Sequence, residues 1–347
     1  MKLRYLLLSL LLLSVFMHCT WKYFVPLCDT TSMYWYHANE RKWNSSGKIL
    51  VLGDSQIVSG ILPETIAELE HVSVEEVIYL PKPSQQPEGI YSDTLYLIPK
   101  LPKLKKIYVN LSPLNTSKNS ITDAHKQLYY SFSKLQSSDL IDPLLRKVYF
   151  PNLTDLLWKI IIQIFPYFGL SSNLNRMFYD QTVQTDLANR RLEFVRIQKS
   201  MEEESGAWIW KSIDKDPSIT KEETFQNLDT TILAGKRDGS IQLWNKVIQT
   251  WKEKQIDVVV FRIPFSPQME MDLDQKQGNG VADSLLESMQ SEANGSKVKV
   301  YNFKSIFLNQ YEYFADLTHL NQKGRDVFAK VIKKELLNHS DPTAKGM

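Results

Sequence analysis

Short continuous apolar runs, separated by stretches of helical periodicity, restrict this chain to few architectures. The first run, Lys48–Leu52, ends at Gly53. Runs of this length suit strands that are covered on both faces, as in parallel sheets. The expected strands span residues 48–52, 74–80, 106–111, 257–262 and 298–303, and the expected helices span residues 56–69, 87–98, 240–254 and 322–337. This alternation predicts an α/β fold with a central parallel sheet.

The alternation stops between about residues 112 and 245, a segment too long for a loop in a compact domain. We therefore expect an inserted helical subdomain at about residues 116–240. It contains the apolar stretch Leu156–Phe168, which is too short to span a bilayer and is interrupted by Lys159 and Pro166. This stretch is either a helix buried within the protein or a helix that faces a membrane or a partner.

The N-terminus has the order of charge and hydrophobicity found in exported proteins. Lys2 and Arg4 precede the apolar run Tyr5–Met17, as in a secretory signal or a signal anchor. No small-residue cleavage pattern follows, and counting on through Val25 gives roughly 20 residues, enough to cross a bilayer. An uncleaved anchor is therefore expected.

This anchor implies an organisation in three parts. Residues 1–25 form the signal anchor, residues 26–47 a connector, and residues 48–347 the main domain with its insertion. The protein would then cross the cell membrane once, with its main domain outside the cytoplasm, in the periplasm of a Gram-negative host. A cleaved signal peptide that leaves a soluble secreted protein is the alternative, because His18 and Lys22 weaken the span.

Composition excludes several classes of function. The 347 residues include 41 basic and 39 acidic side chains, a net charge of +2, so no bulk field favours nucleic acid as a partner. The two cysteines, Cys19 and Cys28, both lie at the front, which leaves the main domain without a disulfide framework or a cysteine metal site. The histidines that lack paired carboxylates at metal-ligand spacing are His37, His71, His125 and His339. We expect neither a metal nor another cofactor.

Two motifs at opposite ends of the predicted core suggest chemistry. Ser55 follows Gly53-Asp54 where the first strand ends and a helix begins, so its hydroxyl would lie at the sheet edge where open α/β folds hold ligands. Asp316 precedes His319 by three residues, just before the last helix. His319 can accept the serine proton, while Asp316 can bind the other ring nitrogen and stabilise the cation. The structural alternative is that Asp54 and Ser55 cap a helix and His319 is a surface residue.

With Gly53-Asp54-Ser55 and Asp316-x-x-His319 in these places, the chain resembles the SGNH/GDSL hydrolase superfamily over roughly residues 48–111 and 257–337. The resemblance implies a flavodoxin-like three-layer sandwich with Ser55, His319 and Asp316 as the catalytic residues. The anchor and the insertion make the chain similar to membrane-anchored proteins of polysaccharide O-acetylation, of the AlgX/AlgJ and DltD kinds. That similarity implies a glycan substrate and, as partner, a multi-spanning membrane-bound O-acyltransferase that supplies the acyl group.

In that superfamily a glycine after the second strand and an asparagine after the third complete the oxyanion hole. Here Ser84 stands where the glycine is expected, and the usual Gly-x-Asn-Asp is missing. Asn115 follows the third strand, whereas Asn110 lies within it. Ser84 and Asn115 are therefore the expected oxyanion residues, and the loss of one donor would weaken catalysis by about 10²–10³-fold.

Three functions remain open from the sequence. The first is transfer of an acyl group, expected to be acetyl, through an acyl-Ser55 intermediate to a cell-surface polysaccharide or glycan. The second is hydrolysis by the same triad, which would make the protein a carbohydrate or lipid esterase. The third is a non-catalytic scaffold that has kept the fold.

Overall fold

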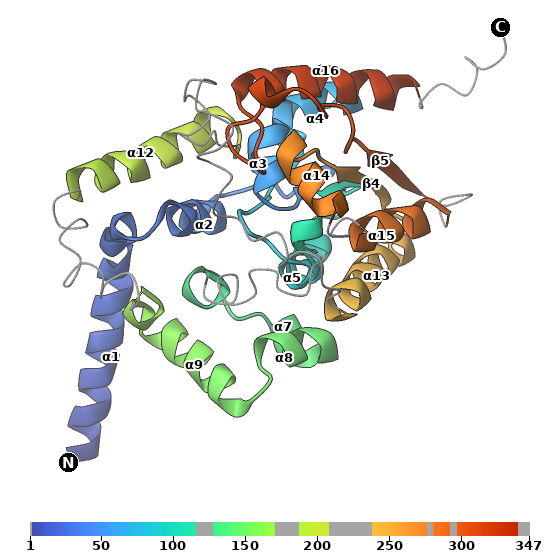
Figure 1. Ribbon diagram of the computed structural model, residues 1–347. Coiled ribbons are helices and arrows are strands. Elements are labelled where there is room, and N and C mark those ends of the chain that lie inside the picture. The colour runs from blue at the N-terminus through green and yellow to red at the C-terminus, as the bar shows by residue number, and fades with distance from the viewer. Residues whose placement is uncertain are drawn as a thin grey trace, which may run out of the picture. The chain divides into compact units, whose positions relative to one another are not determined.

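The computed structural model describes residues 2–115, 128–170, 187–207, 238–275, 280–291 and 297–338 (Figure 1). The chain divides into two units. Unit 1 combines Met1–Arg41 with Asp123–Lys199, and unit 2 combines Lys42–Thr122 with Ser200–Met347. Much of the expected insertion therefore belongs with the N-terminal segment.

A five-stranded parallel sheet forms the centre of unit 2. Its strands are β1 (Ile49–Leu52), β2 (Val77–Tyr79), β3 (Lys106–Asn110), β4 (Asp257–Arg262) and β5 (Val298–Asn302). They lie in the order β2-β1-β3-β4-β5, which is the doubly wound order of flavodoxin-like folds. The predicted α/β class with a central parallel sheet is confirmed. In this order the strand that precedes Ser55 lies next to β3, so the residues that follow β1 and β3 meet at one edge.

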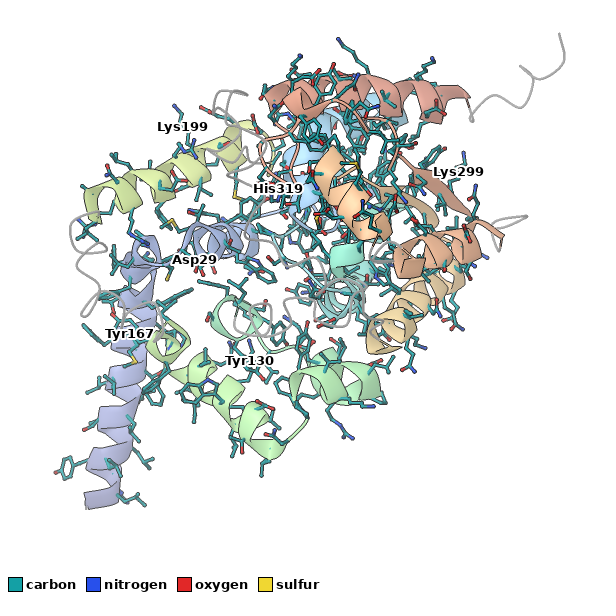
Figure 2. The ribbon with its side chains drawn as sticks, in the orientation of Figure 1. Asp29, Tyr130, Tyr167, Lys199, Lys299 and His319 are labelled. Carbon is teal, nitrogen blue, oxygen red and sulfur yellow. The ribbon has the colours of Figure 1, made fainter. Side chains whose placement is uncertain are left out.

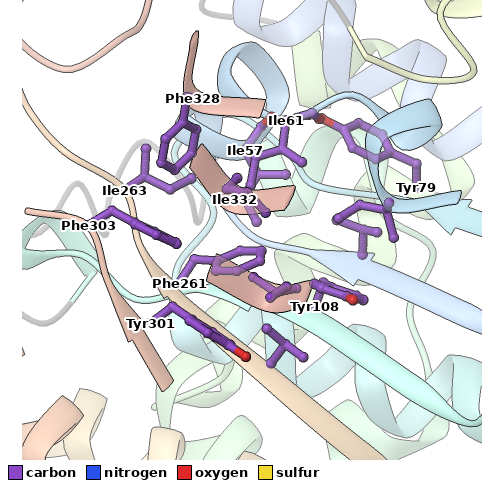
Figure 3. Packing of buried hydrophobic residues seen from close by; sticks show 14 of the residues in the cluster. Ile57, Ile61, Tyr79, Tyr108, Phe261, Ile263, Tyr301, Phe303, Phe328 and Ile332 are labelled. Atoms are coloured by element: carbon purple, nitrogen blue, oxygen red, sulfur yellow. Dashed lines mark hydrogen bonds between the residues drawn. The ribbon is translucent and has the colours of Figure 1, made fainter. Parts of the chain in front are cut away.

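Helices cover both faces of the sheet. One face packs against α3 (Ser55–Gly60), α4 (Pro63–Glu70) and α16 (Gln322–Asn338). Figure 3 shows Ile57 of α3 and Phe328 of α16 packed over Phe261 of β4. The other layer contains α5 (Pro87–Leu97) and α13 (Asp238–Glu253), which a hydrogen bond from Trp251 Nε1 to Thr94 Oγ1 joins at 3.2 Å. The remaining elements of unit 2 are η2 (Val74–Glu76), η3 (Ile98–Lys100), η4 (Pro113–Asn115), α14 (Pro267–Gln275), α15 (Gly280–Ser291) and η8 (Tyr311–Tyr313).

The helix expected over residues 56–69 is two helices. It breaks at Ile61 and Leu62, because Pro63 lacks the N–H that would continue α3 and instead occupies the first position of α4. The second expected strand is also shorter, since Val74–Glu76 forms a 3₁₀ turn in which Glu76 accepts the backbone N–H of Ser73 at 3.2 Å.

Unit 1 is helical in its described residues. Its elements are α1 (Lys2–Thr20), η1 (Trp21–Leu27), α2 (Thr30–Glu40), α7 (Ser137–Ile141), α8 (Pro143–Tyr149), α9 (Leu153–Ile164), η5 (Pro166–Leu170) and the start of α12 (Leu187–Glu203). The continuous segment Leu3–Leu27, of 25 residues, is long and apolar enough to cross a membrane, and its most apolar window is not buried. A membrane anchor and a signal sequence both have these properties.

The burial of α9 contradicts one of the two interpretations of its apolar stretch. A helix buried within the protein would cover its large apolar side chains, but Leu157, Trp158 and Ile161 are 49%, 41% and 37% exposed. The residues of α9 that are buried are Lys159 and Ile162. The interpretation as a buried helix is therefore wrong, and the apolar face of α9 points outward.

Candidate active site

Ser55 is the first residue of α3, directly after the turn that ends β1. Asp54 caps this helix, because its carboxylate accepts the backbone N–H of Gln56 at 2.9 Å. Every residue from Ile49 to Gly60 is buried except Ser55, which is half-buried. The turn therefore leaves the serine as the accessible residue of an otherwise covered segment.

The turn requires glycine at position 53. Gly53 has φ +143°, and a Cβ placed there would lie 2.1 Å from Oδ1 of Asn110. Asn110, the last residue of β3, uses this space to accept the backbone N–H of Asp54 at 3.0 Å and to donate to the Asp54 carboxylate at 2.8 Å. One amide side chain thus fixes both the backbone and the cap of the Ser55 turn.

Asn110 is a residue that the sequence reasoning passed over. It is the last residue of β3, and its side chain reaches the neighbouring end of β1. A polar residue that closes an apolar strand next to a motif-bearing strand was the signal available in the sequence.

The Asp54 carboxylate forms its hydrogen bonds with residues that hold the Ser55 turn. This carboxylate is buried and also accepts the hydroxyl of Ser112 at 3.2 Å. Burial raises the pKa of Asp54, and hydrogen bonds from Gln56, Asn110 and Ser112 partly oppose that rise.

His319 and Asp316 form a hydrogen-bonded pair before α16. Nδ1 of His319 lies 2.8 Å and 3.0 Å from the two carboxylate oxygens of Asp316. The backbone N–H groups of Thr318 and His319 also donate to that carboxylate, at 2.8 Å and 2.9 Å. Although burial acts in the opposite direction, His319 and these donors lower the pKa of Asp316 to about 2. Burial lowers the pKa of His319. The charge of Asp316 and its hydrogen bond outweigh burial and raise the pKa of His319 above its ordinary value.

Further contacts bring the His319 loop to the Ser55 turn. Gln56 Nε2 lies 3.5 Å from the carbonyl oxygens of both Ile263 and Thr318. The charge of Asp54 also contributes to the raised pKa of His319. Leu317 packs with apolar residues of α14, and Figure 2 shows His319 beside that helix. Ser55, His319 and Asp316 therefore belong to one edge of one sheet.

The two expected oxyanion residues lie in loops after β2 and β3, the two strands that flank β1. Ser84 follows β2 and has φ +60°, a backbone conformation that favours glycine. Asn115 ends η4, and its side-chain oxygen accepts the backbone N–H of Ser112 at 3.1 Å. Nδ2 of Asn115 is buried without a hydrogen-bond partner among the described residues. A buried donor with no acceptor costs free energy unless a ligand or water fills the role.

The described residues include no group of three or more His, Cys, Asp or Glu side chains that could hold a metal ion. His37 has its ring 4.4 Å from that of Phe194, and His71 caps the end of α4 with φ +52°. His125 and His339 lie outside the described residues.

Comparisons with known proteins give little for this chain. No protein-family model matches it, and no curated protein matches it. One solved structure, from Bacteroides fragilis and described as a "putative acylhydrolase", aligns with 87% of this chain and 93% of its own, at 9% identity and a TM-score of 0.37.

Proposed function

We propose that the protein is a serine-dependent acyl-ester enzyme that forms an acyl-Ser55 intermediate and passes the acyl group, expected to be acetyl, to a hydroxyl of a cell-surface glycan. The observation that supports this most directly is the His319 ring, held by Asp316 at the sheet edge where the Ser55 turn lies. A serine, a histidine and a carboxylate in these roles supply the nucleophile, the base and the group that orients the base in acyl transfer.

The proposed chemistry has two balanced halves. Because Nδ1 of His319 is bound to Asp316, Nε2 is the nitrogen that takes the Ser55 proton as Oγ attacks the acyl carbonyl carbon. The tetrahedral intermediate then expels the donor's alkoxide or thiolate, which leaves with that proton. In the second half a sugar hydroxyl gives its proton to Nε2 and attacks the acyl-serine, and the proton returns to Ser55.

The negative oxygen of each intermediate needs hydrogen-bond donors. In this proposal the donors are the backbone N–H groups of Ser55 and Ser84 and the amide Nδ2 of Asn115. The glycine-like backbone at Ser84 supports the first assignment, and Nδ2 of Asn115, which has no hydrogen-bond partner in the part of the chain that the structure describes, supports the second. Asn110 holds the turn and is a positioning residue.

Transfer rather than hydrolysis is supported by the N-terminal helix. The segment Leu3–Leu27 has the length and composition of a single-pass anchor, which would hold the site at the membrane surface. There a multi-spanning membrane-bound O-acyltransferase could deliver the acyl group, and the glycan would be the acceptor. The resemblance to anchored polysaccharide O-acetylation proteins supports the same proposal.

The test uses the full chain in detergent with a chromogenic acetyl ester, with and without a sugar acceptor. The variant Ser55→Ala should abolish acetyl release, while Ser59→Ala, one helical turn further on, where the hydroxyl donates to the Ser55 carbonyl oxygen, should keep it. Acetyl-Ser55 should be detectable by mass spectrometry, and the acceptor should become acetylated.

Each other result has a definite meaning. Turnover that survives Ser55→Ala refutes the triad. Acetyl release that leaves the acceptor unmodified identifies an esterase. A wild-type protein that is folded but inert, even with a thioester donor, identifies a scaffold.

A further inference from the structure

Outside α1 and η1, the exposed large apolar side chains of unit 1 lie mainly on α9 and η5. The other exposed ones among the described residues of unit 1 are Ile141, Leu192 and Val195, and the described residues of unit 2 contribute Met271, Leu308 and Leu337. The α9–η5 face is the set of exposed apolar residues Leu153, Leu157, Trp158, Ile160, Ile161, Ile164 and Phe168. At 100° per residue, those on α9 form one continuous stripe along the helix. A stripe of this size facing outward marks an interaction surface.

Buried polar groups hold this stripe outward. Lys159 is fully buried and its ammonium donates to the carbonyl oxygens of Tyr129 at 2.8 Å, Tyr130 at 3.3 Å and Ser133. Gln163, one turn later, donates to Ser133 at 3.2 Å. The inner side of α9 therefore carries the polar groups of Lys159 and Gln163 beside the buried Ile162, and rotating the helix to hide its apolar face would take the buried amine away from its acceptors.

The face is continuous with the candidate membrane span. Ser14 Oγ in α1 donates to the carbonyl oxygen of Ile164 at 2.7 Å, and the hydroxyls of Thr20 and Tyr167 lie 2.5 Å apart. The rings of Phe24 and Tyr167 are 5.0 Å apart. Figure 1 shows α1 in dark blue and the green α9–η5 segment meeting it.

These contacts give the depth at which the face would lie. Ser14 is about 9 Å along α1 from Thr20, at 1.5 Å per residue. If α1 leaves the bilayer near Thr20, the end of α9 lies within the outer half of a hydrocarbon core that is about 30 Å thick.

From this arrangement we infer that the α9–η5 face is a second membrane contact, embedded in the acyl chains of the outer leaflet beside α1. The inference rests on the anchoring in the proposed function. Aliphatic side chains without hydrogen-bonding groups suit lipid, which needs no matching surface. Trp158 and Tyr167 are residue types that favour the headgroup region.

The test places one nitroxide at a time on the full chain in vesicles of phosphatidylethanolamine and phosphatidylglycerol. The background carries Cys19→Ser and Cys28→Ala, and the label sites are Leu11→Cys in α1, Ile161→Cys in α9 and Met271→Cys in α14 of unit 2. Collision with oxygen, which concentrates in lipid, is compared with collision with a water-soluble nickel chelate. Position 161 should resemble position 11, with oxygen collisions several-fold above nickel collisions, and position 271 should show the reverse order.

The outcomes separate this inference from the anchor. A water-like label at 161 with a lipid-like label at 11 overturns the inference and leaves the anchor intact, whereas water-like labels at both sites overturn both. A label at 161 shielded from both reagents means that protein covers the face, which also overturns it. As a second measurement, brominated-chain lipids should quench the unlabelled protein more than its Trp158→Phe variant, and equal quenching would contradict the inference.

Discussion

At the level of single residues, the titration of His319 sets the condition for the proposed catalysis. The ring must be neutral to accept the serine proton, and its pKa lies above the ordinary value of about 6.5. Activity should therefore rise with pH through a pKa above 6.5. Asp316, with a pKa of about 2, stays ionised throughout that range and adds no second acidic limb.

The rate profile of kcat/KM against pH tests this expectation, with Asp316→Asn as the informative variant. Loss of the carboxylate should lower activity by about 10⁴-fold, because the neutral amide no longer selects the reactive tautomer. A profile that is flat between pH 5 and pH 9 would argue against His319 as the base.

Substitution of Asn110 and of Asn115 should differ in how strongly it lowers kcat. Asn110→Ala leaves the backbone N–H and the carboxylate of Asp54 with fewer partners, which should destabilise unit 2 by about 1–3 kcal/mol as well as reduce activity. Asn115→Ala also removes the acceptor of the Ser112 backbone N–H, which should cost a similar amount of stability, and it should in addition lower kcat by about 10²–10³-fold if Nδ2 binds the oxyanion. Hydrogen exchange and steady-state kinetics measure the two effects, and normal kcat in Asn115→Ala would remove it from the site.

At the level of elements, β4 has a buried ion pair at one end and an exposed ion pair at the other, and the two can be compared. At its carboxyl end Arg262 and Glu270 are buried with a 2.9 Å contact, whereas at its start Asp257 and Lys297 are exposed and 3.8 Å apart. Glu270→Gln should cost about 3–5 kcal/mol, because a buried guanidinium loses its counter-charge. Asp257→Asn should change stability by less than about 1 kcal/mol. Exchange of the β3–β5 amides gives both values, and equal effects would contradict this account.

The α9 helix should have its own pH dependence. Burial lowers the pKa of Lys159 from 10.5 to about 7, with the charge of Asp139 acting the other way. Between those two pKa values the unfolded chain binds the proton that the folded chain has released, so stability of unit 1 should rise with pH in that window. Exchange of α9 amides should slow accordingly, relative to the intrinsic rate at each pH. The Lys159→Met variant should remove the trend.

Sequence patterns predicted the elements whose apolar residues face inward. All five strands and the motif residues Ser55 and His319 lie where the pattern placed them. The patterns failed where a partner distant in sequence decides the structure. Which side of α9 is buried depends on the carbonyl oxygens of Tyr129 and Ser133, which accept hydrogen bonds from Lys159. The periodicity within α9 does not show that Lys159 has these acceptors inside the protein.

At the level of the whole molecule, the N-terminal helix decides where the site can act. The full chain should stay with the membrane after alkaline carbonate extraction, and N-terminal sequencing of the purified protein should begin within Met1–Lys22. The physical reason is that Leu3–Leu27 is long enough to span and its most apolar part is not buried. A mature N-terminus beyond Lys22, with the protein in the soluble fraction, would establish a cleaved signal peptide instead.

The strand order has a further consequence for the timing of catalysis. Gln56 and Thr318, which meet at the sheet edge, are 262 residues apart in the chain. At about 5–20 residues per second, a ribosome needs roughly 13–50 s to add the histidine loop after the serine turn has been made. In the proposed mechanism, the nascent chain then has a nucleophile and no base for that interval. An interrupted or prematurely cleaved chain that retains Ser55 should thus be inactive, because the proposed base enters the chain only just before the last helix.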